Sequence, residues 1–200
     1  MRSIEFVLIL AAFTTASSAK QPTTPAAAKP AAHVQSGPAD EAGRQKLHES
    51  AMKFVEAADA RRRLAQSLDK LLEDGKQSMM HTNPGLDPRF GEEWVKRMRT
   101  RVSLDQIVVA TAQVYEKYFS SDELEELAQG QLALKKGEIH TLPPGLAEKL
   151  KTNSPFIQRD INTQTTIIGG RLGSEVGKEI EKEHPEWIKP APAPAPTAKK

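Results

Sequence analysis

A run of carboxylates offers the most concentrated chemistry in this sequence. Four acids fall within a few residues of one another: Asp122, Glu123, Glu125 and Glu126. Grouped carboxylates can bind a metal ion or act as acid and base. The same acids follow Ser120, a predicted helix start, where the helix dipole stabilises each negative charge by about 0.3 to 1 kcal/mol without any function. The helix start is a sufficient explanation, so the sequence predicts no metal site here.

Histidines are the next candidates for chemistry, and they are scattered. They are His33, His48, His81, His140 and His184. No two stand at a spacing that would place both on one helix face, as a metal site built on a helix requires. Cysteine is absent, which excludes a thiolate nucleophile. The sequence also contains no serine-hydrolase elbow, phosphate-binding glycine loop or His-Glu-x-x-His motif. We therefore expect a non-enzymatic protein with no catalytic residue and no cofactor.

A row of three glycines is the remaining candidate site. Gly169, Gly173 and Gly177 are spaced four residues apart and so line one side of the last predicted helix. Each glycine costs about 1 kcal/mol relative to alanine inside a helix, which favours a packing role. The flat row would let another helix approach closely, from the same chain or from a protein partner or second copy. The three glycines are the candidate interaction face.

Apolar periodicity predicts the helices that would position these residues. We expect a first helical region that begins near Pro38 and bends near residues 57–61, because two apolar stripes there are offset by about a quarter turn. Asp87 caps the next helix and Pro88 occupies its first turn. The apolar stripe of that helix includes Trp94, which we interpret as a core residue.

Two capping boxes predict a corner between two further helices. The pairs that form them are Ser103 with Gln106 and Ser120 with Glu123. Phe119 precedes the second cap and can pack on Leu124 as a hydrophobic staple. The second of these helices is expected to end at Gly137, directly after two lysines. Its expected buried residues are Leu124, Leu127, Leu132 and Leu134.

The last helix is predicted to begin with Ser154 as its cap and Pro155 in its first turn, and to run toward Glu183. Its apolar stripe consists of Ile157, Ile161, Ile168, Leu172, Val176 and Ile180. Trp187 follows the helix and is expected to fold back onto the core. Together these patterns predict an all-α fold, a compact bundle of about five or six helices in residues 38–188.

The two ends of the chain differ in composition from this helical region. Residues 1–19 have the pattern of a secretory signal peptide, with Arg2 before an apolar run and small residues before an expected cleavage site after Ala19. Residues 20–37 are rich in Pro, Ala and Thr, which predicts a disordered linker. Residues 189–200 consist mainly of Pro, Ala and Lys, which predicts a disordered tail. We therefore expect a bacterial periplasmic or secreted protein that is not transmembrane after signal cleavage.

The balance of charge argues against nucleic acid as a partner. The sequence has 28 Lys and Arg against 26 Asp and Glu, a net charge of +2, which is too small for a nucleic-acid-binding footprint. The basic tail in residues 189–200 could instead contact an anionic envelope polymer. The alternative is that the tail only increases solubility.

The corner between the two capped helices reads Tyr-Glu-Lys-Tyr-Phe-Ser-Ser-Asp-Glu-Leu-Glu-Glu-Leu in residues 115–127. It resembles an exported bacterial family known as the domain of unknown function 2059. The matching residues are Phe119, Ser120, Glu123 and Leu124, with Ser in place of the family's usual Thr. The family's aromatic pair and Ser-Pro-x-Gly turn are replaced by residues 134–137, of which only Gly137 matches. The final helix, with Gly173 and Gly177, is also similar in position. The resemblance implies an exported all-helical domain and adds no catalytic residues, because the family has no assigned activity.

These observations predict an exported protein that interacts with a partner or with the envelope and has no enzymatic activity. The alternative is a small-ligand binder or hydrolase whose site lies in a cleft between helices. A cleft onto which two or more titratable side chains converge would favour this alternative.

Overall fold

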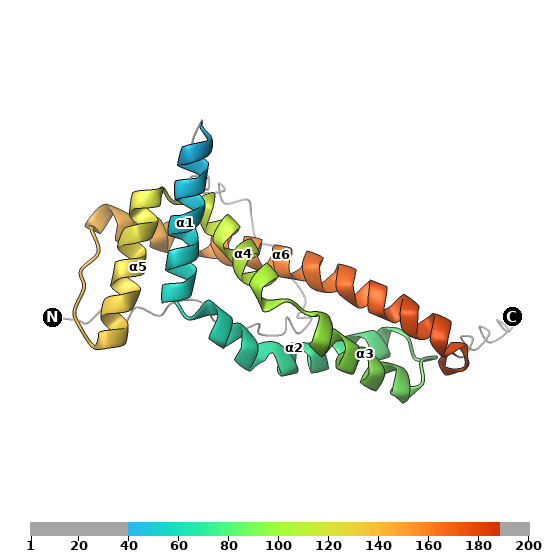
Figure 1. Ribbon diagram of the computed structural model, residues 1–200. Coiled ribbons are helices and arrows are strands. Elements are labelled where there is room, and N and C mark those ends of the chain that lie inside the picture. The colour runs from blue at the N-terminus through green and yellow to red at the C-terminus, as the bar shows by residue number, and fades with distance from the viewer. Residues whose placement is uncertain (1–39, 189–200) are drawn as a thin grey trace, which may run out of the picture. The chain divides into compact units, whose positions relative to one another are not determined.

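The computed structural model describes residues 40–188, which form an all-α fold of six α-helices and one short 3₁₀ helix (Figure 1). The helices are α1 (Glu41–Ala57), α2 (Ala60–Thr82), α3 (Pro88–Arg101), α4 (Leu104–Glu116), α5 (Ser121–Lys136), α6 (Pro144–Glu183) and η1 (Pro185–Trp187). The predicted signal peptide, linker and tail lie outside the described residues. Within residues 40–188, no helix is both long enough and apolar enough to span a membrane.

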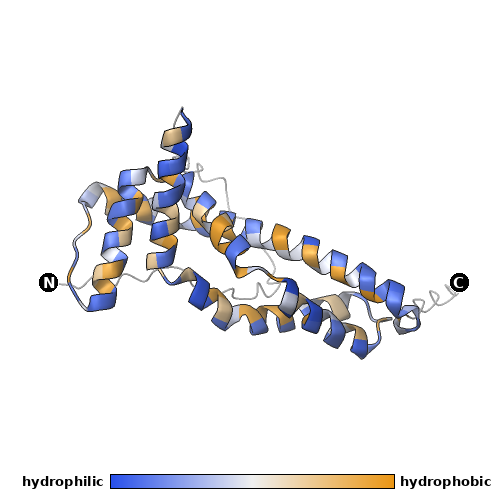
Figure 2. Cartoon of the chain, in the orientation of Figure 1, coloured by the Kyte–Doolittle hydropathy of each residue, from blue (hydrophilic) through white to orange (hydrophobic). Residues whose placement is uncertain are grey.

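The helices group into two compact units. Unit 1 contains the described residues up to Arg63 together with Asp105–Thr165, and therefore α1, α4, α5 and the first part of α6. Unit 2 contains Leu64–Leu104 and the described residues from Thr166 onward, and therefore most of α2, α3, the second part of α6 and η1. Figure 2 shows apolar residues recurring between polar ones along the helices. A helix with such an apolar stripe is stabilised by packing that stripe against a neighbour.

The core of unit 1 is built around an aromatic stack at the α4–α5 corner. Phe54 of α1 meets Tyr115 edge to face, with 4.8 Å between ring centroids, and Tyr115 stacks on Phe119 at 6.3 Å. The capping box predicted after Phe119 is confirmed. The Glu123 amide donates to Ser120 Oγ at 3.3 Å, and the Ser120 amide donates to Glu123 Oε2 at 2.8 Å. The predicted stop is also confirmed, because Gly137 caps α5 with a φ of 74°.

The prediction that α5 buries Leu132 and Leu134 is wrong. Both side chains are about half exposed, and α5 instead buries Leu124, Leu127, Ala128, Gly130 and Gln131. At 100° per residue, Leu132 and Leu134 lie about 80° to either side of Leu124. The two leucines therefore stand at the edges of the packed face, where only part of each side chain can be covered.

The core of unit 2 is formed by α2, α3 and the second part of α6. Its buried residues are Leu72, Phe90, Trp94, Val95, Met98, Val176 and Ile180. Trp94 is a core residue as predicted, and Trp187 packs against the same cluster from η1. Asp87 caps α3 by accepting a hydrogen bond from the Arg89 amide at 2.9 Å, with Pro88 in the first turn as expected.

The first helix starts close to the predicted position, and the predicted break follows it. The first helix begins at Glu41 and is capped by Asp40, whose Oδ1 accepts from the Gly43 amide at 2.7 Å, while Pro38 lies outside the described residues. The predicted break after α1 is confirmed, because the chain leaves the helix at Ala58 and Asp59 has a positive φ of 56°.

The prediction that the last helix begins at Ser154 and Pro155 is also wrong. Helix α6 begins at Pro144 and continues through Pro155, and the Ser154 hydroxyl donates to the Leu150 carbonyl at 2.7 Å instead of capping a helix. An internal proline costs about 3 kcal/mol. Leu146 and Ile157, on either side of it, are both buried, and each contributes about 1.5 to 3 kcal/mol. Burial on both sides of Pro155 therefore offsets its cost.

Candidate functional site

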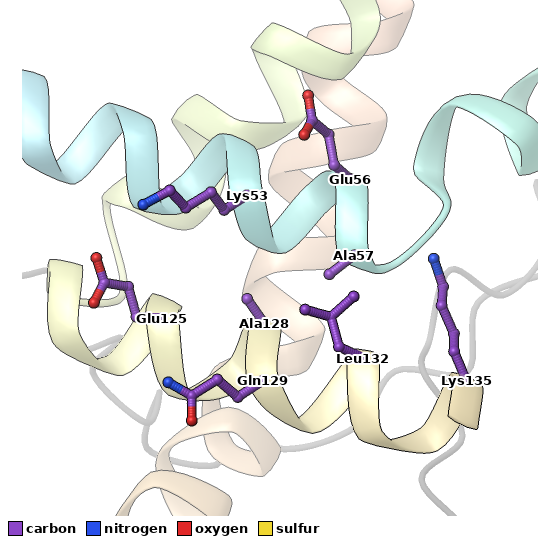
Figure 3. Close-up of a pocket in the computed structure, with 8 residues that line it drawn as sticks. All are labelled: Lys53, Glu56, Ala57, Glu125, Ala128, Gln129, Leu132 and Lys135. Carbon is purple, nitrogen blue, oxygen red and sulfur yellow. The ribbon is translucent and has the colours of Figure 1, made fainter. Parts of the chain in front are cut away.

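A groove with a volume of about 530 Å³ runs between α1 and α5 in unit 1. It is the candidate functional site, and we refer to it as the α1–α5 groove. Its lining residues are Lys53, Glu56, Ala57, Glu125, Ala128, Gln129, Leu132 and Lys135, all drawn in Figure 3. Every one of them belongs to α1 or α5, so unit 1 alone supplies the whole groove.

Small side chains create the apolar floor of the groove. Ala57 of α1 and Ala128 of α5 are buried with exposed fractions of 5% and 7%, whereas Leu132 beside them is 47% exposed. Figure 3 shows these three side chains facing one another between the two helices. Because neither alanine can fill the space above it, one face of Leu132 remains available to another apolar group.

Charged and polar side chains form the rim. Lys135 Nζ lies 2.7 Å from Asp59 Oδ1, and this hydrogen bond holds the pKa of Asp59 below its usual range. Glu125 Oε1 accepts from the Ser50 hydroxyl at 3.2 Å. The side chains of Lys53, Glu56 and Gln129 have no hydrogen-bond or ion-pair partner within residues 40–188. The rim therefore offers a cation, an anion and an amide that are free to pair with a bound group.

The chemistry of this lining suits binding better than catalysis. It contains no histidine, serine, threonine or tyrosine, and its two carboxylates lie on different sides of the groove (Figure 3). General acid–base work needs a titratable group within hydrogen-bond reach of the reacting proton. Glu56 belongs to α1 and Glu125 to α5, and the two carboxylates do not face each other as a pair for acid–base hydrolysis would.

The acids that follow Ser120 do not converge either. Each has its own partner: Asp122 with Lys46 at 2.9 Å, Glu123 with Lys149 at 2.7 Å, Glu125 with Ser50 at 3.2 Å, and Glu126 with His140 at 2.9 Å. No group of three or more potential metal ligands occurs in the described part of the chain. These acids instead connect the start of α5 to α1, to the segment before α6 and to α6 itself.

The glycine row packs against α3 inside unit 2. A Cβ atom at Gly173 would lie 3.0 Å from Trp94 Cζ2, and Trp94 Nε1 donates to the Gly173 carbonyl at 3.0 Å. A Cβ atom at Gly177 would lie 4.0 Å from Phe90 Cζ, whereas a Cβ atom at Gly169 would meet no described atom within 4 Å. Of the two interpretations of the row, close packing within the chain explains Gly173. Only Gly169 offers an open surface.

The histidines lie apart from one another, and three of them pair with a glutamate. The pairs are His48 with Glu116 at 2.7 Å, His140 with Glu126 at 2.9 Å and His184 with Glu186 at 3.2 Å. His184 also stacks on Trp187 with 3.8 Å between ring centroids. His140 lines a cavity of about 20 Å³ beside Gly130, which has room for a single water molecule. His33 lies outside the described residues.

Sequence reasoning did not find the groove. Its apolar floor joins Ala57 to Ala128, residues with no local pattern in common, and its exposed leucine was expected to be buried. The spacing of Ala128 and Leu132, one helical turn apart, was the only available signal.

Comparisons of the chain with protein-family models, with curated proteins and with solved structures find no match. The resemblance to the domain of unknown function 2059 therefore stays a prediction.

Proposed function

We propose that this protein is an exported bacterial interaction protein, without enzymatic activity, that binds an amphipathic helix of a partner protein in the α1–α5 groove. The observation that carries the proposal is the groove itself, with an apolar floor and a rim on which Lys53 and Glu56 are unpaired. A space between two packed helices matches the shape of a third helix, whose apolar side chains enter the groove.

Charge on the rim narrows the kind of helix that would fit. Two lysines and two glutamates line the groove, so it carries no excess of either sign. A partner helix with an apolar stripe flanked by both acidic and basic residues would pair with Lys53 and Glu56, whereas a uniformly charged helix would place like charges together. This pattern also makes a polyanion a poor occupant.

Site-specific photo-crosslinking tests the proposal. A photoreactive phenylalanine derivative in place of Gln129, on the groove, should give a discrete crosslinked protein in the producing bacterium. The same derivative in place of Gln113, an exposed residue of α4 outside the groove, is the matched control. Crosslinks at Gln129 that map to an amphipathic helix, and are missing at Gln113, support the proposal. Identical products at both sites, or none at Gln129, contradict it.

Export is a separate part of the proposal and rests on residues 1–19. Fractionation of the bacterium should recover the protein from the periplasm or medium, with Lys20 as its first residue. Recovery of the uncleaved chain from the cytosol would contradict export without affecting the groove.

The tail in residues 189–200 adds a second, independent contact to the proposal. Its lysines can attract an anionic envelope polymer. Deleting residues 190–200 should shift the protein from the envelope fraction to the soluble one. An unchanged distribution would leave the tail with a solubilising role.

A further inference from the structure

Helix α6 has a central segment in which no residue is fully buried. Buried residues recur every four residues at Asn153, Ile157 and Ile161 in unit 1, and again at Val176 and Ile180 in unit 2. Between Ile161 and Val176 no residue of α6 is buried. Leu172 and Gly173 still pack on the core of unit 2, so the weakly supported part is residues 162–170. Most of the stability of a protein helix comes from packing of its apolar face, and these residues have little of it.

Residues 162–170 of this segment are mostly poor helix formers. Residues 162–170 read Asn-Thr-Gln-Thr-Thr-Ile-Ile-Gly-Gly, with five β-branched residues and two glycines and neither alanine nor leucine. The Thr163 hydroxyl donates to the Arg159 carbonyl at 2.9 Å, a bond that competes with the helix ladder and often bends it. A Cβ atom at Gly169 or Gly170 would meet no described atom within 4 Å, so packing does not require glycine there.

Residues 162–170 lie where α6 passes from unit 1 to unit 2. The chain crosses between unit 1 and unit 2 three times, and on α6 it does so between Thr165 and Thr166, in the middle of the segment. The other two crossings lie within about one turn of a helix start, at Arg63–Leu64 in α2 and at Leu104–Asp105 in α4. Among the three crossings, that of α6 alone lies in the middle of a helix, more than four turns from either helix end, so reorientation of the units would require α6 to bend there.

We propose that residues 162–170 are a hinge, at which α6 opens locally and lets unit 1 and unit 2 change orientation. A hinge needs a few residues that absorb a backbone change without disturbing a core. Residues 162–170 meet both conditions, because none is buried and all except Gln164 have a weak helix preference. The α1–α5 groove lies wholly in unit 1, so such motion would leave the groove itself unchanged.

A distance measurement along α6 tests the hinge. The sequence contains no cysteine, so Arg159→Cys and Glu181→Cys introduce two unique sites for spin labels, both at exposed positions. A straight helix over this span would separate the two backbone positions by about 33 Å. In the full mature chain we expect a broad distance distribution that extends well below this value.

A stiffened variant makes the test specific. Thr163→Ala, Thr166→Ala, Gly169→Ala and Gly170→Ala together should narrow the distribution to about 33 Å, because alanine is the strongest helix former. They should also slow amide hydrogen exchange of residues 163–170 by about 100-fold. A control with Thr152→Ala and Ser174→Ala, at exposed positions of α6 outside the segment, should behave like the parent. A narrow parent distribution, or a width that the four alanines leave unchanged, would overturn the proposal.

Discussion

Replacing Gly173 with alanine is expected to destabilise unit 2, whereas the same change at Gly169 is expected to stabilise it. Alanine is better than glycine inside a helix by about 1 kcal/mol, and this gain applies at both positions. At Gly173 the new Cβ atom would lie 3.0 Å from Trp94 Cζ2. Trp94 is 9% exposed and is tied to the Gly173 carbonyl by its indole N–H, so it has little freedom to retreat.

Overpacking of a core costs about 1 to 3 kcal/mol. After the gain in helix preference is subtracted, Gly173→Ala should lower the free energy of unfolding by about 0 to 2 kcal/mol. Gly169→Ala meets open space, so it should raise the free energy of unfolding by about 0.5 to 1 kcal/mol. The two variants should therefore differ in free energy of unfolding by about 1 to 3 kcal/mol, although they make the same chemical change on the same helix.

Tryptophan fluorescence during urea unfolding measures this difference. The sequence has two tryptophans, Trp94 and Trp187, and both belong to unit 2, so their signal reports that unit. Gly173→Leu extends the test, because its larger side chain should abolish the native Trp94 signal. Equal stabilisation by alanine at both glycines, or a folded Gly173→Leu protein with an unchanged Trp94 environment, would refute the packing of α6 on α3.

Three further predictions concern unit 1. Ser120→Ala should lower its stability by about 1 kcal/mol at neutral pH, as measured by tyrosine absorbance in urea. Burial raises the pKa of Glu123, but hydrogen bonds from Lys149 and Ser120 hold it below its usual range. The stability gained from ionised Glu123 is present above its unfolded pKa and is lost as the pH falls through its folded pKa, so the Ser120→Ala difference should shrink on acidification. Burial raises the pKa of Tyr115 to about 12. Unit 1 should therefore lose stability as the pH rises from about 10 to about 12, and Tyr115→Phe should reduce that loss in circular dichroism. Gly137→Ala should cost about 1 kcal/mol in thermal unfolding, because its φ of 74° is unfavourable for alanine; an unchanged melting temperature would contradict the cap.

Local signals predicted those features of the fold that a few neighbouring residues determine. The Asp87 cap, the Ser120 capping box and the Gly137 stop each depend on hydrogen bonds or backbone angles within one turn. Pro155 failed as a helix start for the opposite reason. Its local preference is outweighed by burial of residues on both sides, which only the tertiary structure supplies.

The candidate site was harder to predict because it depends on how distant residues meet. The spacing of Gly173 and Gly177 indicated close approach, but not that Trp94, 79 residues away in sequence, would be the group that approaches. The groove likewise depends on the register of α1 against α5, which places Ala57 opposite Leu132 and near Ala128. No pattern within either helix contains that register.

The central claim is that the α1–α5 groove binds a partner, and two leucines of α5 test it most directly. Leu132 lines the groove and is 47% exposed, whereas Leu134, 49% exposed on the same helix, does not line it. Both should accept aspartate with similar effects on stability. The measurement is the yield of the Gln129 crosslink in each variant. We predict that Leu132→Asp abolishes the crosslink and Leu134→Asp preserves it; equal yields in the two variants would contradict the claim.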